Sequence, residues 1–429
     1  MNSKQRSLKS SIFKGIAFSL GIFITIVILA IAAYFLYQSG FISKKTVSLL
    51  DSVYGTVTNI NTVTKPLRPA KNFSNKPNPY LNSEFSIPPG LSQVIVHDYQ
   101  ELAQQIQKAN QAPFGTQILM ADGTYTLEET IGISGDYIMI SSISGSPEDV
   151  IIQGGKFANT GLANLFRVTG KHFILSGVTL RNSKYHLVQI AGESDADYPV
   201  IRNCIFQDAY QQLLKVSYDK EKRPDISSDY GLVENSRFEY SAGKGPNFYI
   251  GGLDIHAGNS WVIRNNTFKG IASPSKSITE HAIHVWNNAY NTIVDSNIIE
   301  NCDRGVGFGL SHGIDHPNIA YSHRGGIIKN NLIIHNDNGA PFADSGIILE
   351  NSPETIIINN RIWLEHDYPN AIEYRFPSTH DVLITNNMTN KLIQSRDGGS
   401  ARLEDNHTDS TLADILEQQI LKDAKLIYE

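Results

Sequence analysis

Apolar and polar residues recur along most of this chain in a short phrase that returns at nearly regular intervals. The phrase consists of two apolar residues, one variable residue and, in most copies, an asparagine. It stands at residues 200–203, 232–235, 262–265, 293–296, 327–330, 356–359 and 383–386, with a weaker copy at 403–405. Subtracting the successive starting positions of the seven full copies gives intervals between 27 and 34 residues. A period near 30 is typical of solenoids, in which the repeats stack on one another.

Each repeat is built from short β-rich phrases and contains no helical stretch. This pattern favours a parallel β-helix over leucine-rich or helical repeats. We therefore predict an all-β fold, a parallel β-helix over residues 91–410. The asparagines that end the phrases are expected to stack at one turn, each side-chain amide bonding to the next coil, and to have no ligand role.

The pattern at the start of this region predicts a cap for the first coil. Residues 93–96 read as a short strand, and residues 99–110 place Leu102, Ala103 and Ile106 at helical spacing. Further short strands are expected at 117–125, 137–140 and 150–155. A helix before these strands would cover the exposed edge of the stack.

A second cap is predicted at the C-terminus, over residues 411–429. Thr411 and Asp414 fit a capping box, and the apolar side chains that follow form a stripe at helical spacing. The stripe consists of Leu412, Ile415, Leu416 and Ile420.

The N-terminus carries the strongest hydrophobic signal. Residues 16–37 are apolar almost throughout, and about 20 residues at about 1.5 Å rise cover a hydrocarbon core of about 30 Å. The basic residues before this stretch are Lys4, Arg6, Lys9 and Lys14. By the positive-inside rule, we expect residues 1–15 in the cytoplasm, residues 16–37 as the membrane anchor and the β-helix on the far side, in the periplasm or outside the cell. A cleaved signal peptide is the alternative, because Ala30-Ile31-Ala32 has the small-x-small form.

Between the anchor and the first strand, residues 38–90 are rich in Pro and Asn and show little alternation. Proline forbids ladder hydrogen bonds, so this segment reads as an extended linker. The sequence leaves open whether the linker is free or packs along the side of the domain.

Charge and cysteine content narrow the partners and the redox chemistry. With 36 basic and 42 acidic residues, the chain gives no electrostatic case for binding nucleic acid. Cys204 and Cys302 lie about three coils apart, roughly 14 Å at about 4.8 Å per coil, beyond the reach of a disulfide of about 7 Å between Cα atoms.

Aligning the strand before each phrase separates inward from outward positions. The first and third residues of these strands are apolar almost every time and face the core, so the second and fourth face solvent. One outward row then contains Lys215, Asp254, His284 and Gly307. The other contains His256, Trp286, Gly309, Glu350, Arg375 and Arg396. Neighbouring coils are about 4.8 Å apart, which lets polar side chains meet.

This register defines a candidate site. The predicted catalytic residues are Lys215, Asp254, His256 and His284, and the predicted substrate-binding residues are Trp286, His281, Arg304, Glu350, Glu373, Arg375 and Arg396. The alternative for the charged members is a solvated surface with simple salt bridges, such as those that Arg375 can form with Glu350 or Glu373. His281 has the alternative of ordering a turn.

The chain also resembles a known family. Phrases at 121–125 and 151–155 resemble those that open the first coils of right-handed parallel β-helix proteins. Residues 162–406 are similar to a group of bacterial exported right-handed parallel β-helix repeat proteins of the pectin-lyase-like superfamily. The phrases that carry this similarity are GGLDIHAGNSWVIRNNTF, EHAIHVWNNAYNTIVDSNIIENCDRGVGFGL, GGIIKNNLI, PNAIEYRF and NNMTNKLIQSRDGGSA. The resemblance implies a right-handed coil and specifies no reaction.

More distant resemblances point toward uronate polysaccharides. Asp254-Ile255-His256 resembles the Asp-Pro-His part of the alginate C5-epimerase motif, and Ser275-Lys276-Ser277 resembles the lysine phrase of chondroitinase-B-type lyases. β-Helices with a solvent groove often handle long unbranched polysaccharides, as pectate lyases do, which is an analogy of fold.

Lyases and C5-epimerases of this kind need a cation beside the uronate carboxylate, a base for the C5 proton and an acid. Lys215 would supply the cation, His256 or His284 the base, and the other imidazole the acid. Asp254 would hold a histidine tautomer or raise a histidine pKa.

Three hypotheses remain open from the sequence. The first is a membrane-anchored enzyme acting on a uronate-containing polysaccharide, as a lyase or C5-epimerase. The second is a non-catalytic glycan-binding or cell-envelope scaffold protein. The third adds a divalent metal held by Asp254, His256 and His284, since three N/O ligands with open positions suit zinc. No other cofactor is expected.

Overall fold

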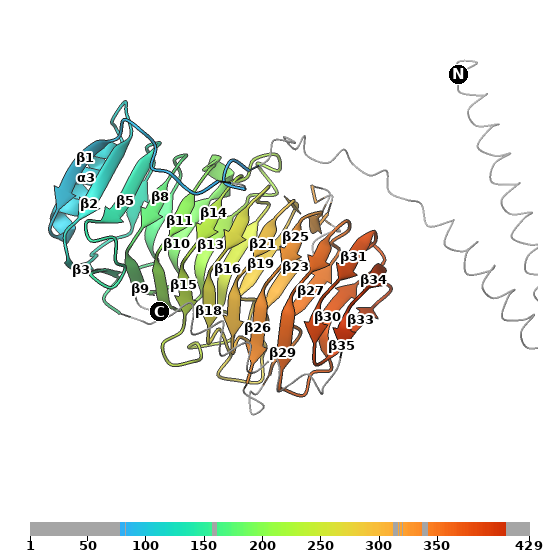
Figure 1. The fold of residues 1–429 in the computed structure, drawn as a ribbon. Coiled ribbons are helices and arrows are strands. Elements are labelled where there is room, and N and C mark those ends of the chain that lie inside the picture. Colours follow the sequence, from blue (N-terminus) through green and yellow to red (C-terminus); the bar gives the residue numbers. More distant parts are fainter. Residues whose placement is uncertain are drawn as a thin grey trace, which may run out of the picture. The chain divides into compact units, whose positions relative to one another are not determined.

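Three long parallel sheets form the sides of a coil that the chain follows repeatedly (Figure 1). The computed structural model describes residues 78–81, 83–156, 161–311, 316, 318–319, 321–336 and 342–408, all within the unit formed by residues 69–429. Between residues 116 and 396, each turn of the chain contributes one strand to each of the three sheets. This is a parallel β-helix, which confirms the predicted fold.

The strand bounds follow the repeat. The 12-stranded sheet contains β1 (Ser92–Val96), β2 (Thr116–Met120), β5 (Ile138–Ser142), β8 (Ile174–Ser176), β11 (Val200–Arg202), β14 (Leu232–Glu234), β17 (Val262–Arg264), β21 (Ile293–Asp295), β25 (Ile327–Lys329), β28 (Ile356–Ile358), β31 (Val382–Thr385) and β34 (Ala401–Glu404). The 11-stranded sheet contains β3 (Gly123–Thr126), β6 (Val150–Gln153), β9 (Thr179–Ser183), β12 (Ile205–Ala209), β15 (Arg237–Glu239), β18 (Thr267–Lys269), β22 (Ile298–Glu300), β26 (Leu332–His335), β29 (Arg361–Leu364), β32 (Met388–Thr389) and β35 (His407–Thr408).

The third sheet carries the candidate site. Its ten strands are β4 (Ile131–Ile133), β7 (Asn164–Val168), β10 (His186–Ala191), β13 (Gln212–Ser217), β16 (Gly251–His256), β19 (Ile283–Trp286), β23 (Val306–Gly309), β27 (Ile347–Glu350), β30 (Asn370–Arg375) and β33 (Leu392–Arg396). A short pair, β20 (Ala289–Tyr290) with β24 (His323–Arg324), and a 3-10 turn, η1 (Gly192–Ser194), complete the described β-helix.

Inward side chains of successive coils stack to form one continuous core. Phe206, Phe238 and Phe268 lie on neighbouring coils with ring centroids 4.7 and 5.0 Å apart, and all three are fully buried. Each coil therefore covers the apolar side chains of the one before it, which a single repeat cannot do alone. Both cysteines are free and buried, in agreement with the sequence.

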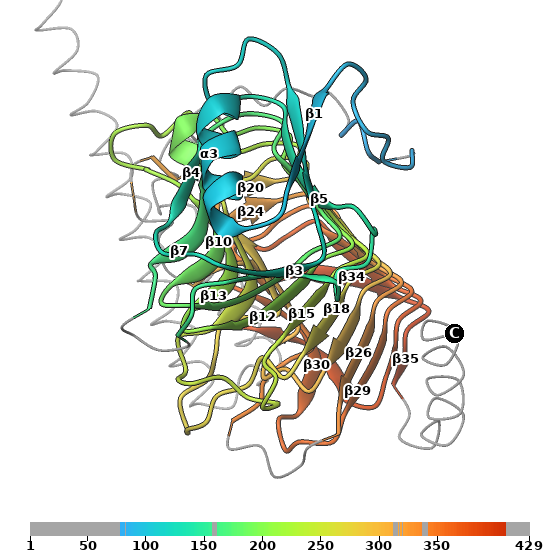
Figure 2. The same ribbon diagram turned by 90° about the vertical axis from the view of Figure 1, so that its left-hand side faces the viewer.

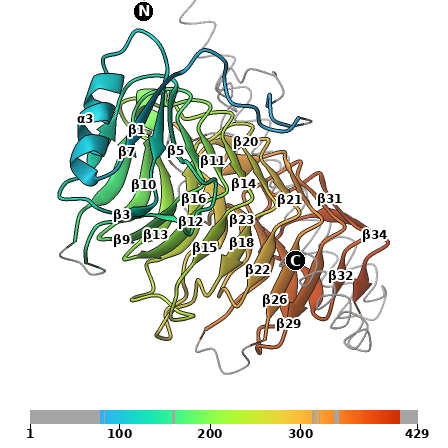
Figure 3. The same ribbon diagram turned by 60° about the vertical axis from the view of Figure 1, so that its left-hand side comes forward.

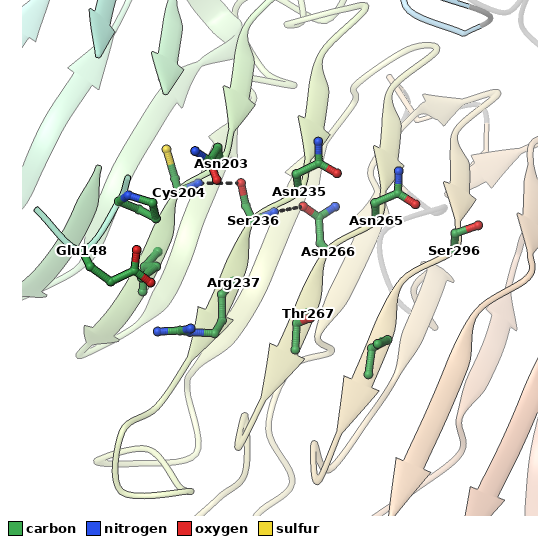
Figure 4. Close-up of a pocket in the computed structure, with 13 residues that line it drawn as sticks. Glu148, Asn203, Cys204, Asn235, Ser236, Arg237, Asn265, Asn266, Thr267 and Ser296 are labelled. Atoms are coloured by element: carbon green, nitrogen blue, oxygen red, sulfur yellow. Dashed lines mark hydrogen bonds between the residues drawn. The ribbon is translucent and has the colours of Figure 1, made fainter. Parts of the chain in front are cut away.

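The asparagine ladder is real, but it stands one residue later than the sequence analysis placed it. Asn203, Asn235 and Asn265 have φ angles of 48°, 50° and 55°, so they make the left-handed turn between two sheets. Asparagine tolerates this conformation better than most residues. Figure 4 shows these three side chains in one row, with Cys204, Ser236 and Asn266 in the row beside them. The prediction that the phrase-ending asparagines form the ladder is therefore wrong.

The ladder itself consists of the residues that follow, namely Asn266, Asn297, Asn331, Asn360, Asn387 and Asn406. In each of the first five, the side-chain Nδ2 donates to the Oδ1 of the next asparagine at 2.9 to 3.0 Å and to a backbone carbonyl of the preceding coil. The ladder thus satisfies buried backbone groups at the corner of the coil.

Helix α3 (Tyr99–Ala109) covers the first coil, as the sequence predicted (Figure 2). Asp98 caps its N-terminus by accepting a hydrogen bond from the Glu101 N–H at 2.8 Å. Leu102, Ile106 and Ala109 are its buried residues, and they belong to the main core cluster.

The described end of the linker packs along the domain, which decides between the two alternatives for that part. Asn78 donates to the carbonyls of Gly231 and Ser260 at 3.2 and 2.7 Å. Tyr80 and Phe85 pack against a small apolar cluster on the outer face of the 12-stranded sheet. Figure 3 shows this segment in blue, leading away from β1 past later coils.

Two predicted helices lie outside the described residues, the membrane anchor at 16–37 and the C-terminal cap at 411–429. Among the residues that the structure describes, none of the helices is long and apolar enough to cross a membrane.

Candidate functional site

The predicted register of the ten-stranded sheet is confirmed. Lys215 pairs with Asp254, and Asp254 pairs with His284. His284 pairs in turn with Gly307 on β23. Alternation along each strand places these residues on the outer face, because their neighbours in sequence are core residues. The register also pairs His256 with Trp286 in the second outward row.

An ammonium, a carboxylate and an imidazole meet at the centre of this face. The Lys215 Nζ donates to Asp254 Oδ2 and lies 2.7 Å from Nε2 of His256. Nε2 of His256 is also 3.3 Å from Asp254 Oδ1. The Lys215 side chain is 14% exposed and that of His256 is 13% exposed, so both remain accessible at the surface. Asp254 is buried beneath them.

These contacts fix the protonation of His256. An ammonium group can only donate, so the 2.7 Å contact requires a lone pair on Nε2 of His256. The ring hydrogen then stands on Nδ1, which lies 3.1 Å from Nδ2 of Asn287. Nδ1 can donate to this amide once the amide is turned over, so that Oδ1 takes the place of Nδ2. Asn287 has a φ of 61°, at the turn directly after β19.

Trp286 holds the carboxylate from the other side. Its indole Nε1 donates to Asp254 Oδ1 at 2.8 Å. Its ring stacks on His284 at 5.3 Å between centroids and meets His256 edge-on at 4.3 Å. Trp286 is half-buried, so it orders the cluster as well as offering part of an aromatic face.

Charge inside the cluster sets the pKa of each group. Burial alone raises the pKa of the Asp254 carboxyl, but the Lys215 ammonium outweighs it and holds that pKa well below its ordinary value. Burial, together with Lys215, lowers the pKa of His256 despite the adjacent Asp254 carboxylate. The site therefore combines an ionised carboxylate with a neutral imidazole.

His284 is enclosed more deeply than its neighbours. Its Nε2 donates to the Gly309 carbonyl at 2.9 Å, and its Nδ1 lies 3.3 Å from Glu280 Oε2. Burial lowers the pKa of His284, but the hydrogen bond with Glu280 outweighs this and raises it. The prediction that His284 faces solvent is wrong, because 1% of its side chain is exposed. Both of its ring nitrogens are engaged, so His284 supports the cluster from below.

His281 and Arg304 approach the same region from the ends of strands. The His281 ring lies 4.6 Å from the His284 ring, between centroids. Arg304 is half-buried and donates to Asp344 Oδ2 at 3.2 Å. Both residues therefore flank the cluster, as the sequence suggested.

The other predicted binding residues form a second cluster further along the sheet. Glu373 is three coils beyond His284, about 14 Å at about 4.8 Å per coil. It is fully buried and bonded to Arg396 at 2.8 Å. Arg375 pairs with Glu350 at 2.5 Å and with Asp397. Of the two pairs that the sequence offered for Arg375, the one with Glu350 is present, whereas Glu373 pairs with Arg396 instead.

Sequence reasoning missed two residues that complete these clusters. Tyr368 donates from its hydroxyl to Glu373 at 2.5 Å, and Asn287 reaches His256. Both stand outside the strands, where the alternation rule does not apply. The Asn287-Asn288 pair after β19 was the one available signal, because adjacent asparagines favour a left-handed turn.

A cavity of about 480 Å³ lies elsewhere, along the turn between the 12-stranded and 11-stranded sheets (Figure 4). Glu148, Arg237 and the turn asparagines line it. It does not include any residue of the candidate site.

No protein-family model matches the chain, and no curated protein matches its sequence. Among solved structures, the chain is similar to pectate lyase Pel9A at 15% identity and a TM-score of 0.43, covering 75% of this chain and 81% of the lyase. It is similar to PfbA, a surface adhesin of Streptococcus pneumoniae, at 12% and 0.45, covering 72% and 85%. It is also similar to the tailspike protein of E. coli bacteriophage HK620, solved with a pentasaccharide, at 12% and 0.49, covering 72% and 61%. At these identities the likeness concerns the fold alone.

Proposed function

We propose that this chain acts on a uronate-containing polysaccharide by removing the C5 proton of a uronate, as a lyase or a C5-epimerase. The observation that carries the proposal is the contact of Lys215, Asp254 and His256 on the outer face of adjacent strands. Proton removal beside a carboxylate needs a base and a cation that stabilises the charge developing on that carboxylate. The base and the cation of this cluster are 2.7 Å apart.

His256 is the base in this proposal. Its lowered pKa keeps the ring neutral at neutral pH, and Nε2 carries the lone pair. In the free protein that lone pair accepts a hydrogen bond from Lys215. A uronate carboxylate bound to Lys215 draws the ammonium toward the substrate, so that Nε2 can accept the C5 proton. Asp254, held ionised, then stabilises the imidazolium that forms.

The electrons of the broken C5–H bond define two outcomes. In elimination they form the C4–C5 double bond, the C4–O bond breaks, and the leaving oxygen takes a proton from the imidazolium. In epimerisation the carbanion is stabilised as the carboxylate dianion beside Lys215. A proton from water then returns to C5 from the opposite face, and His256 releases to solvent the proton that it took. The same base serves both reactions.

Product analysis on a panel of uronate polymers tests the proposal. Purified full-length protein is incubated with alginate, homogalacturonan, glucuronan and chondroitin in D₂O. Elimination gives unsaturated ends that absorb in the ultraviolet, and epimerisation introduces deuterium at C5, which NMR detects. We expect one of these products from at least one polymer. The absence of both products from every polymer would overturn the proposal.

A non-catalytic glycan-binding or envelope scaffold protein is the second candidate. It is favoured by the hydrogen bonding of Asp254, whose two carboxylate oxygens already accept from Lys215 and Trp286. A cluster so fully paired suits rigid binding. This candidate predicts saturable binding of a polysaccharide with no product formed, and affinity that survives His256→Gln.

We also propose the location that the hydropathy pattern indicates, with residues 16–37 anchoring the chain in a bacterial inner membrane and the β-helix on the outer side. Protease added to spheroplasts should then digest the exposed domain, and carbonate washing should leave the chain in the membrane pellet. Release by carbonate would contradict the anchor.

A further inference from the structure

His281 is a buried imidazole beside His284. It is 1% exposed, and neither ring nitrogen has a hydrogen-bond partner among the described residues. A buried polar group left unpaired costs about 1 to 3 kcal/mol, so such a group calls for an explanation. Gly307 provides the room for this ring, since a Cβ at that position would lie 2.6 Å from Nε2 of His281. The fold thus makes space for the His281 ring, while the described residues offer its nitrogens no hydrogen bond.

His284 is oriented beside it in the way that metal-binding histidines usually are. Its Nε2 donates to the Gly309 carbonyl at 2.9 Å, which fixes the ring and turns Nδ1 toward Glu280. A backbone carbonyl that receives one ring N–H is a common outer support for a metal ligand. Glu280 Oε2 lies 3.3 Å from that Nδ1.

The geometry points to a binding site for a divalent transition metal ion, zinc in the first instance, formed by Glu280, His281 and His284. Each offers one ligand atom, and these three atoms lie within 4.8 Å of one another. Two imidazoles and one carboxylate suit zinc, whereas calcium and magnesium prefer oxygen ligands. The site goes beyond the proposed glycan chemistry and does not depend on it.

The proposed metal site has one side that is open to solvent. The Glu280 side chain is 31% exposed, while both histidines are buried, so solvent reaches the site past the carboxylate. Three protein ligands with a solvent-facing fourth position are the arrangement of catalytic zinc sites, whereas structural zinc is closed by four. Water or a substrate oxygen would occupy that position.

The charges nearby favour this side of His284 over the side that faces His256. Asp254 Oδ1 is 3.9 Å from Nδ1 of His284 and adds negative charge. Arg304 is the nearby cation on the Glu280 side, and it is paired with Asp344. The set Asp254, His256 and His284 is less suitable, because the Lys215 ammonium already lies against Nε2 of His256.

Metal binding is measured on full-length protein purified without a polyhistidine tag. Calorimetric titration with ZnCl₂ should give one ion per chain with a dissociation constant at or below the micromolar range. Binding of Co²⁺ should produce the visible absorption bands of a site with nitrogen and oxygen ligands. His281→Gln should weaken zinc binding on the order of 100-fold or more, since loss of outer support alone costs about 10 to 100-fold.

Two further variants make the result decisive. His380→Gln changes a surface histidine, whose side chain is 49% exposed, and should leave the zinc affinity unchanged. Glu280→Gln alters the half-exposed ligand and should weaken binding even if His281→Gln fails to fold, with circular dichroism as the check on folding. The proposal is overturned if wild-type protein shows no stoichiometric binding, or if folded His281→Gln or Glu280→Gln binds zinc as tightly as wild type. Because the readout is metal binding, neither outcome depends on the proposed enzyme activity.

Discussion

Replacing Asn331 by alanine tests how much the asparagine ladder contributes to the stack. The Asn331 amide makes four hydrogen bonds within buried surroundings. Its Oδ1 accepts from the N–H and Nδ2 of Asn297 at 2.9 and 3.0 Å, and its Nδ2 donates to Val294 O and Asn360 Oδ1 at 3.0 and 2.9 Å. At about 1 kcal/mol per hydrogen bond, the substitution should cost about 4 kcal/mol of unfolding free energy.

The matched control is the preceding residue. Asn330 has a φ of 55°, and its side chain donates a hydrogen bond to Asp295 Oδ1 at an exposed position. Asn330→Gly keeps a residue suited to this backbone and should change the unfolding free energy by about 1 kcal/mol or less. Urea unfolding, followed by the fluorescence of the buried Trp261, compares the two variants. A cost below 1 kcal/mol for Asn331→Ala, or equal costs for both, would refute the ladder's role.

Three further predictions concern the candidate site and its surroundings. Asp254→Asn leaves the Lys215 ammonium without its charged partner and should cost about 3 to 5 kcal/mol in urea unfolding, with partial recovery when Lys215→Met is added; a cost under 1 kcal/mol would contradict this. Gly307→Ala should displace the His281 ring and lower the melting temperature, and an unchanged melting curve would show that the close approach is absent. Burial raises the pKa of the Asp303 carboxyl to about 7, so its contribution to stability is complete below about pH 4 and is lost as the pH rises toward 7. Asp303→Asn should therefore gain stability relative to wild type over that range, by about 1.4 kcal/mol per pH unit, and a difference that does not vary with pH would argue against the raised pKa.

The sheet that carries the site was predictable because its strands obey a simple alternation. Leu253 and Ile255 face the core, and this alone places Asp254 and His256 outside. The pairing of Asp254 with His284 followed from counting the repeat, because successive coils stack on one another in a constant register.

The sequence analysis assigned the ladder to the wrong asparagines for a physical reason. Several coils contain two adjacent asparagines, such as Asn330 and Asn331, and asparagine suits both a left-handed turn and a buried amide ladder. The repeat phrase cannot tell these roles apart. Two coils did distinguish them, because Ser296 and Asp405 stand at the turn while an asparagine follows each of them in the ladder.

The parts of the site outside the strands could not be predicted. Glu280 and His281 precede β19, and Tyr368 precedes β30, so neither alternation nor the period fixes where their side chains point. Their positions depend on how each loop closes over its own coil. The unpaired state of His281 was likewise invisible in the sequence, since it depends on the open space above Gly307.

The role of His256 is the most direct test of the proposed chemistry. Once a uronate polymer that reacts has been found, wild type and His256→Gln are compared on it in the same product assay and in a binding titration. Removal of a general base should lower kcat by about 100 to 10,000-fold and leave the affinity for the polymer nearly unchanged. Product formation by His256→Gln at the wild-type rate would contradict the account.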